Sequence, residues 1–104
     1  MSLKTRKLNV SLAGGYTSEG LEKDGSHGTF VAIFSDMQGG ADAKLQQSID
    51  GDAWSDVPGS ETTIEAGETE RMWTENIMPR GTMVRMNITE TTGNLVAIKL
   101  LSNE

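Results

Sequence analysis

The stretch that decides the fold is Leu45-Gln46-Gln47-Ser48-Ile49-Asp50-Gly51-Asp52-Ala53-Trp54-Ser55-Asp56-Val57-Pro58, residues 45–58. Leu45, Gln47 and Ile49 alternate with polar residues, and this two-residue period is typical of a half-buried strand. Asp50-Gly51 indicates a tight turn, because glycine adopts positive φ freely and aspartate can bond the turn backbone. The stretch therefore predicts a strand, an acidic turn and a returning chain, with Ile49 and Trp54 anchoring the two ends of the turn in the core.

Chain length and composition fit a single β domain. The 104 residues are enough for one ordinary domain, and they include 12 glycines, six methionines and only five aromatic residues. Six methionines indicate an adaptable core or surface. We expect one domain over residues 1–104, in which the basic residues 1–6 form a flexible end.

The charge balance excludes several classes of partner. The net charge is −6, whereas a nucleic-acid-binding protein needs a basic face that displaces counterions from phosphates. An anionic membrane surface is excluded for the same reason. The absence of cysteine excludes disulfides, thiol nucleophiles and cysteine-ligated metals. No apolar run is long enough for a signal peptide or a membrane span, so we expect synthesis in the cytoplasm.

Segments with strand character recur along the chain. Residues 29–34 are apolar on both faces, which is typical of a strand in the middle of a sandwich or at a subunit interface. Residues 82–90 place Val84, Met86 and Ile88 on one face. We expect an antiparallel hairpin between this segment and residues 95–100, because a turn signal separates them.

Turn signals divide the chain into seven or eight short strands, and no helical period is present. Met78-Pro79-Arg80-Gly81 is one predicted break, because proline lacks an N–H donor and glycine has no side chain to pack. This pattern predicts an all-β fold, namely a single antiparallel β-sandwich with a jelly-roll-like topology.

No catalytic set or zinc site is recognisable. His27 is the only histidine, and it lies among glycines and serines. A Ser–His–Asp triad needs a histidine that a third group holds in place, and a tetrahedral zinc site needs several histidine or cysteine ligands. We therefore expect no enzyme activity, no cofactor and no metal. A hydrolase with a carboxylate pair is a third alternative, although no two acids stand out as that pair.

The acids after residue 49 partly match the spacing of a calcium-binding loop. Asp50, Asp52, Asp56 and Glu61 match the first, third, seventh and twelfth positions of an EF-hand. The sixth position, where that loop requires glycine, is Ser55, and no helices flank it. The pattern excludes an EF-hand and leaves an irregular calcium site open.

Four segments carry a family resemblance. They are Leu8-Asn9-Val10-Ser11-Leu12 after the basic start, residues 43–59, Met83-Val84-Arg85-Met86-Asn87-Ile88-Thr89, and Thr92-Gly93-Asn94-Leu95-Val96-Ala97-Ile98. In this order they resemble small β-sandwich structural proteins of tailed-phage virions, of the head-decoration and head-fibre type. Residues 43–59 look like the Ser-x-Asp-Gly and tryptophan unit of that family, and residues 83–89 look like its penultimate strand, with an outward arginine at Arg85.

The resemblance implies a non-enzymatic protein of a phage or prophage virion, made in the bacterial host cytoplasm. It implies self-association as a homo-oligomer, expected to be a trimer, and attachment to a capsid or another virion protein. Such a role depends on surface burial, with an apolar centre and a polar rim. The candidate interface residues are Phe30, Val31, Met72, Met83 and Arg85.

A glycan-binding module is the alternative. The unit from Ser48 to Trp54 is also similar to the equivalent stretch of discoidin-type sugar- and lipid-binding sandwiches. Trp54 and Trp73 are then the candidate glycan contacts, because an indole ring can stack on a sugar. Tryptophan also serves as a core residue whose indole N–H finds a partner, and the sequence leaves this choice open.

Overall fold

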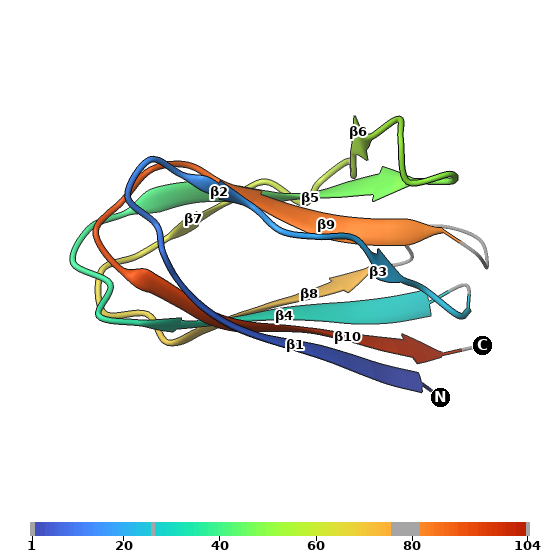
Figure 1. Ribbon diagram of the computed structural model, residues 1–104, viewed down its shortest axis with the longest axis horizontal. Helices are drawn as coiled ribbons and strands as arrows, with labels where there is room; N and C mark the ends of the chain where they lie inside the picture. Colours follow the sequence, from blue (N-terminus) through green and yellow to red (C-terminus); the bar gives the residue numbers. More distant parts are fainter. Residues whose placement is uncertain (1, 26, 76–81, 104) are drawn as a thin grey trace.

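The computed structural model describes residues 2–25, 27–75 and 82–103, which form two antiparallel sheets packed face to face (Figure 1). Sheet A has the strand order β1-β10-β4-β8. Sheet B has the order β2-β9-β5-β6, with β3 also paired to β9 and β7 to β5. The strands are β1 Ser2–Ser11, β2 Tyr16–Thr17, β3 Leu21–Glu22, β4 His27–Ser35, β5 Ala41–Ser48, β6 Ser55–Asp56, β7 Thr62–Ile64, β8 Glu70–Glu75, β9 Met83–Ile88 and β10 Asn94–Asn103.

The connections give a jelly roll. β2 and β3 both pair with β9, and β6 and β7 both pair with β5, so each of these short pairs fills one strand position. The chain then crosses between the sheets at most connections, as a jelly roll does. The predicted all-β sandwich is confirmed. The structure has ten strands instead of seven or eight because two of the strand positions are interrupted.

The predicted hairpin between residues 82–90 and 95–100 is wrong. β9 belongs to sheet B, whereas β10 lies between β1 and β4 in sheet A. The connection crosses between the sheets and is held by the Leu12 N–H, which donates to the Gly93 carbonyl at 2.9 Å, and by the Gln38 N–H, which donates to the Thr92 carbonyl at 2.9 Å. A strand with one inward face has alternating apolar and polar residues, whichever strand it pairs with. The alternation in residues 82–90 and 95–100 therefore could not show that the chain crosses from one sheet to the other between them.

Both sheets bury their inward residues in one core. The inward faces of β9 and β5 are as predicted at Val84, Met86, Ile88 and Leu45. Trp73 and Phe30 also lie in this core, with ring centroids 5.9 Å apart in an edge-to-face arrangement. The Trp73 indole Nε1 donates to the Ser60 carbonyl at 2.8 Å, which ties β8 in sheet A to the chain before β7.

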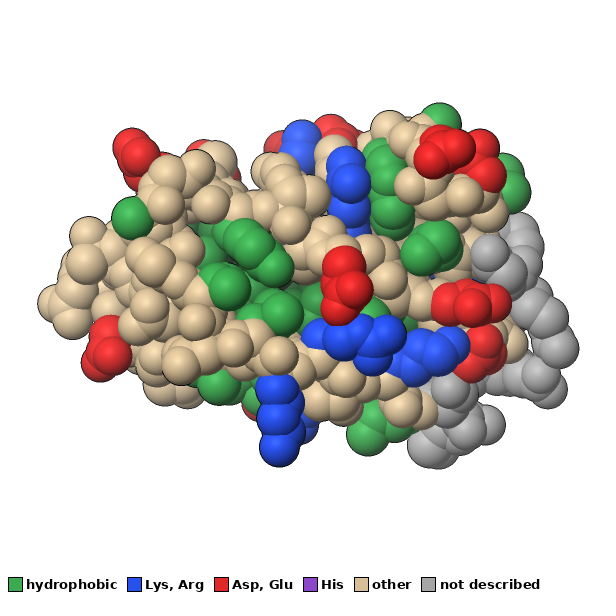
Figure 2. All heavy atoms as spheres, viewed as in Figure 1, with side chains coloured by type: hydrophobic (Ala, Val, Ile, Leu, Met, Phe, Trp, Pro, Cys, Tyr) green, Lys and Arg blue, Asp and Glu red, His purple; other side chains and the backbone are tan. Residues whose placement is uncertain are grey.

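Residues 2–6 of the basic start lie in strand β1. β1 pairs with β10 from Ser2 onward, so the first and last strands of the chain lie side by side (Figure 1). Lys4 forms an ion pair with Asp24 at 2.9 Å, and Arg6 forms one with Glu19 at 2.8 Å. Both acids lie beside the short strands of sheet B, and basic and acidic side chains accordingly meet on the face shown in Figure 2. The basic residues therefore bridge one edge of the sandwich.

Arg71 bridges the opposite edge. From β8 it donates to both carboxylate oxygens of Glu68, through Nε at 2.8 Å and Nη2 at 2.7 Å. It also donates to the Thr63 carbonyl at 3.0 Å and to the Thr62 hydroxyl, both in β7 of sheet B. The guanidinium thus joins the two sheets where neither has a further strand.

The break at Met78-Pro79-Arg80-Gly81 lies outside the described residues. Across the described ranges, no helix is long and apolar enough to cross a membrane.

Candidate functional surfaces

The acidic turn at residues 49–54 is held by its own hydrogen bonds. The Asp50 carboxylate accepts the N–H of Asp52 at 2.9 Å and of Ala53 at 3.1 Å. The Ser48 hydroxyl donates to Asp50 at 3.2 Å and accepts the Gly51 N–H at 2.8 Å. These bonds, led by the Asp52 N–H, lower the pKa of the Asp50 carboxyl. The conformation of the turn is therefore held by hydrogen bonds within the chain itself.

The expected core anchors of this turn are not in the core. Ile49 is 79% exposed, because β5 ends at Ser48 and the turn leaves the sheet there. Trp54 is half-buried on the outside of sheet B, where its Nε1 donates to the Gly51 carbonyl at 3.1 Å. The Arg85 guanidinium stacks on the indole at 4.1 Å from the ring centroid. The prediction was wrong for both residues.

Two of the four acids between 50 and 61, Asp50 and Asp56, are engaged with different partners. Asp56 accepts hydrogen bonds from Gln46 at 3.1 Å and Lys44 at 3.0 Å, and these bonds lower the pKa of its carboxyl. Asp50 is engaged in the turn. Within residues 2–25, 27–75 and 82–103, no group of three or more histidine, aspartate or glutamate side chains is arranged to hold a metal ion.

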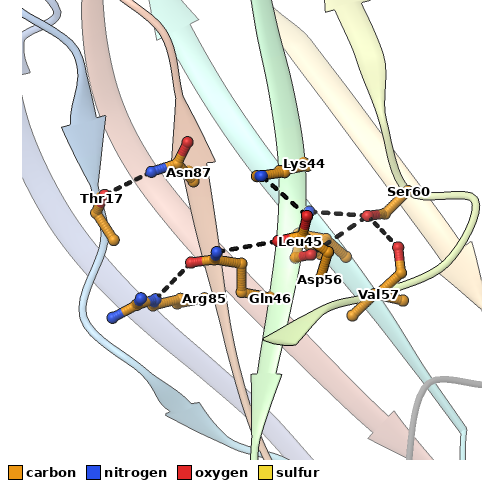
Figure 3. Close-up of polar contacts among 9 residues, drawn as sticks. All are labelled: Thr17, Lys44, Leu45, Gln46, Asp56, Val57, Ser60, Arg85 and Asn87. Carbon is orange, nitrogen blue, oxygen red and sulfur yellow. Dashed lines mark hydrogen bonds and ion pairs between the residues drawn. The ribbon is translucent and has the colours of Figure 1, made fainter. Parts of the chain in front are cut away.

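A row of polar side chains crosses the outer face of sheet B (Figure 3). Arg85 Nε donates to Gln46 Oε1 at 2.9 Å, and Gln46 in turn donates to Asp56. Two residues along the same strands, and on the same face, Asn87 lies opposite Lys44. Asn87 donates to the Thr17 hydroxyl at 2.7 Å. The row is therefore ordered by contacts between neighbouring strands.

A polar pocket of about 440 Å³ opens beside this row. Its lining includes Asp42, Lys44, Glu61, Thr63 and Asn87, so it offers carboxylates, an ammonium group, an amide and hydroxyls. Such groups can hydrogen-bond a hydroxyl-rich ligand. Trp73, a predicted glycan contact, is only 5% exposed and contributes nothing to this surface.

The outer face of sheet A carries a group of apolar side chains among threonines and charged residues. In register across the strands, Val31 lies opposite Met72, and Leu3 lies opposite Leu101. Met72 is 53% exposed and Leu3 is 63% exposed, and Val31 and Leu101 are half-buried. Lys99 lies between Thr5 and Val31 on the same face. The outer face of sheet A comprises five large apolar residues and the polar residues in register with them, namely Leu3, Val31, Ile33, Met72 and Leu101 with Thr5, Lys7, Thr29, Glu70, Thr74 and Lys99.

The five predicted interface residues do not form one surface. Phe30 is completely buried in the core. Val31 and Met72 lie together on the outer face of sheet A, whereas Met83 and Arg85 lie on the outer face of sheet B. Leu3 and Leu101, which also lie on the outer face of sheet A, were not among the predicted residues, although the alternation in residues 95–101 was a usable signal for the side of Leu101.

Lys23 is a buried lysine that sequence reasoning also missed. Its side chain is completely buried between β3 and β4, and its ammonium group donates to the Gly25 carbonyl. Burial lowers the pKa of the amine. The hydrogen bond to Gly25 gives the Lys23 ammonium group a partner within the fold.

Comparisons with known proteins give the fold. No family model matches the sequence, and no curated protein matches it. A structure of TmCBM61 in complex with β-1,4-galactotriose superposes with a TM-score of 0.58 at 13% identity, covering 97% of this chain and 82% of that chain. PirA gives a TM-score of 0.54 at 7% identity, covering 95% and 93%. The chain shares their β-sandwich fold.

A larger protein contains the same fold as one part. The xylanase 10B CBM22-1-GH10 modules of Clostridium thermocellum, complexed with xylohexaose, give a TM-score of 0.52 at 16% identity. The match covers 96% of this chain and 25% of that chain. At these identities the likeness concerns the fold alone.

Proposed function

We propose that this chain is a non-enzymatic structural protein that self-associates through the outer face of sheet A and decorates or projects from a phage or prophage particle. The observation that carries the proposal is the apolar outer face around Val31 and Met72. The resemblance of the four sequence segments to virion proteins supplies the setting.

The extent of the outer face of sheet A and its exposed apolar side chains support this proposal. The chain measures 36 × 25 × 21 Å, and in Figure 1 the strands run along the longest dimension while the sheets stack across the intermediate one. These dimensions bound the face at about 36 by 21 Å, so a contact that covers most of it could approach the roughly 800 Å² that each partner buries in a standard interface. Lys7 and Glu70 lie at its two edges, which gives it a polar rim.

Met72→Asp is expected to weaken self-association at least about tenfold, because it places a charge in the apolar centre. Sedimentation velocity over a range of concentrations measures the effect. Ala66→Asp is the matched control, since Ala66 is exposed in the turn between β7 and β8, away from this face. A Met72→Asp protein that associates like the wild type would contradict the proposal.

Glycan binding on the outer face of sheet B is a second candidate. The polar pocket favours it, and two of the similar structures were solved with oligosaccharides. A glycan on this chain would be held by hydrogen bonds that its hydroxyls donate to Asp42 and exchange with Lys44 and Asn87, because Trp73 is buried and Arg85 stacks on Trp54.

Asn87→Ala is expected to weaken binding of any glycan found on an array by about tenfold, because it removes a polar contact worth roughly 1–2 kcal/mol. Calorimetry on the glycan hit measures the change, and Met72→Asp serves as the variant that leaves sheet B intact. An array on which the wild-type chain binds nothing would remove this candidate.

A further inference from the structure

We infer that the outer face of sheet A binds the 49–54 turn of a second copy of this chain, in a head-to-tail contact. The inference rests on the proposed self-association and names the surface that the partner presents. It comes from two features that the fold leaves unused, one on each side of the molecule.

The first feature is the apolar side chain at the start of the turn. Ile49 is the most exposed of the large hydrophobic side chains that the structure describes, at 79%. The carboxylates of Asp50 and Asp52 lie beside it in the chain, and both residues are exposed. Because Asp50 and Ser48 already fix the turn, presenting Ile49 to a partner requires little further ordering.

The second feature is the charge on the outer face of sheet A. Lys99 lies among Val31, Thr5 and the neighbouring Leu101, and within the described part of the chain its ammonium group forms no ion pair. The Asp52 carboxylate likewise has no ion-pair partner among the described residues. The exposed apolar side chains of the outer face of sheet A could therefore contact Ile49, and Lys99 could pair with the acids beside Ile49.

A face-to-face pair fits the same observations less well. It would bring two copies of Lys99 into one interface whose acid, Glu70, lies at the rim on the edge strand β8, and desolvating like charges is costly. The turn instead brings carboxylates to Lys99 and Ile49 to Val31 and Met72.

The positions of the two features set the kind of assembly. In Figure 1 the segment between β5 and β6 lies on the side of sheet B that faces away from sheet A, and Figure 2 shows acidic side chains gathered there. Each copy bound through its turn therefore keeps a free face for another copy. Such a heterologous contact builds a ring or an open chain. A ring of three would be the trimer that the family resemblance implies.

Mixing two defective variants tests the contact. Ile49→Ser removes the turn contact and keeps the face, whereas Met72→Asp removes the face and keeps the turn. Each alone is expected to sediment as a monomer, and their equimolar mixture is expected to form a one-to-one heterodimer that grows no further. Circular dichroism and thermal unfolding are the control that checks that both variants fold, which we expect because Ile49 and Met72 are exposed.

The outcomes separate this inference from the proposed function. If Ile49→Ser associates like the wild type while Met72→Asp does not, the turn is not the partner and self-association through sheet A stands. A mixture that stays monomeric would also overturn the inference. If the wild-type chain itself does not associate, both the inference and the proposed function fail.

A charge exchange tests the same contact independently. Lys99→Asp and Asp52→Lys are each expected to weaken association at least about tenfold, and the double variant is expected to recover most of the loss. Asp52 is suited to this exchange because its side chain, unlike that of Asp50, takes no part in the hydrogen bonds of the turn. A double variant as weak as either single one would contradict the pairing of Lys99 with Asp52.

Discussion

Replacing Trp73 with alanine is expected to lower the free energy of unfolding by about 3–5 kcal/mol, the usual cost of removing a large buried aromatic ring. The indole is 5% exposed, packs edge-to-face on Phe30, and donates to the Ser60 carbonyl. Its loss leaves a cavity between the sheets and a buried carbonyl without this donor. Urea unfolding followed by circular dichroism measures the change.

The other tryptophan is the matched control for this prediction. Trp54 is half-buried outside sheet B, so Trp54→Ala is expected to cost about 1 kcal/mol, mainly from the stacked Arg85. Trp73→Phe should fall between the two, because it keeps an aromatic ring and loses the hydrogen bond to Ser60. A larger loss for Trp54→Ala than for Trp73→Ala would contradict the assignment of Trp73 to the core.

Arg71→Met is expected to lower the free energy of unfolding by about 2–3 kcal/mol, because hydrogen bonds to charged groups contribute more than neutral ones. The guanidinium joins β8 in sheet A to β7 in sheet B and also holds Glu68. The exposed fractions of the Arg71 and Glu68 side chains are only 28% and 19%. Methionine keeps most of the apolar stem, so the loss reports the polar contacts.

Arg6→Met is the control at the opposite edge. The ion pair of Arg6 with Glu19 is more exposed, at 48% and 57%, and surface pairs of this kind contribute at most about 1 kcal/mol. Equal losses for Arg71→Met and Arg6→Met would contradict the stronger role assigned to Arg71.

The effect of Arg71→Met also depends on pH. The hydrogen bond from Arg71 lowers the pKa of the Glu68 carboxyl below its ordinary value of 4.5. A depressed folded-state pKa contributes stability above the ordinary pKa, and that stability is lost as the pH falls through the folded value. The difference between wild type and Arg71→Met should therefore be smaller at about pH 3 than at pH 7, and a difference independent of pH would contradict this pairing.

Local patterns in the sequence predicted much of the fold. The alternation of Val84, Met86 and Ile88 correctly identified the inward face of β9, and the apolar segment at 29–34 correctly identified a central strand of sheet A. The partner of β9 was not predictable from alternation, because hairpins and crossings between sheets give strands the same period. Long-range register decides between them.

Which residues reach each candidate surface also depends on strand pairing between segments far apart in the sequence. Val31 and Met72 were recognised as interface candidates, but Leu3 reaches the same face only because β1 pairs with β10. Ile49 continues the alternation of β5 in the sequence, yet the hydrogen bonds of Ser48 and Asp50 turn the chain out of the sheet before it. Sequence periodicity therefore gave the wrong side for the residue on which the further inference depends.

The most direct test of self-association is the mass of the wild-type chain in solution, measured by sedimentation equilibrium or light scattering over a wide range of concentrations. We predict that the weight-average mass rises above the 11.2 kDa of a single chain as the concentration increases. A mass that stays at 11.2 kDa at every concentration would contradict the proposed self-association.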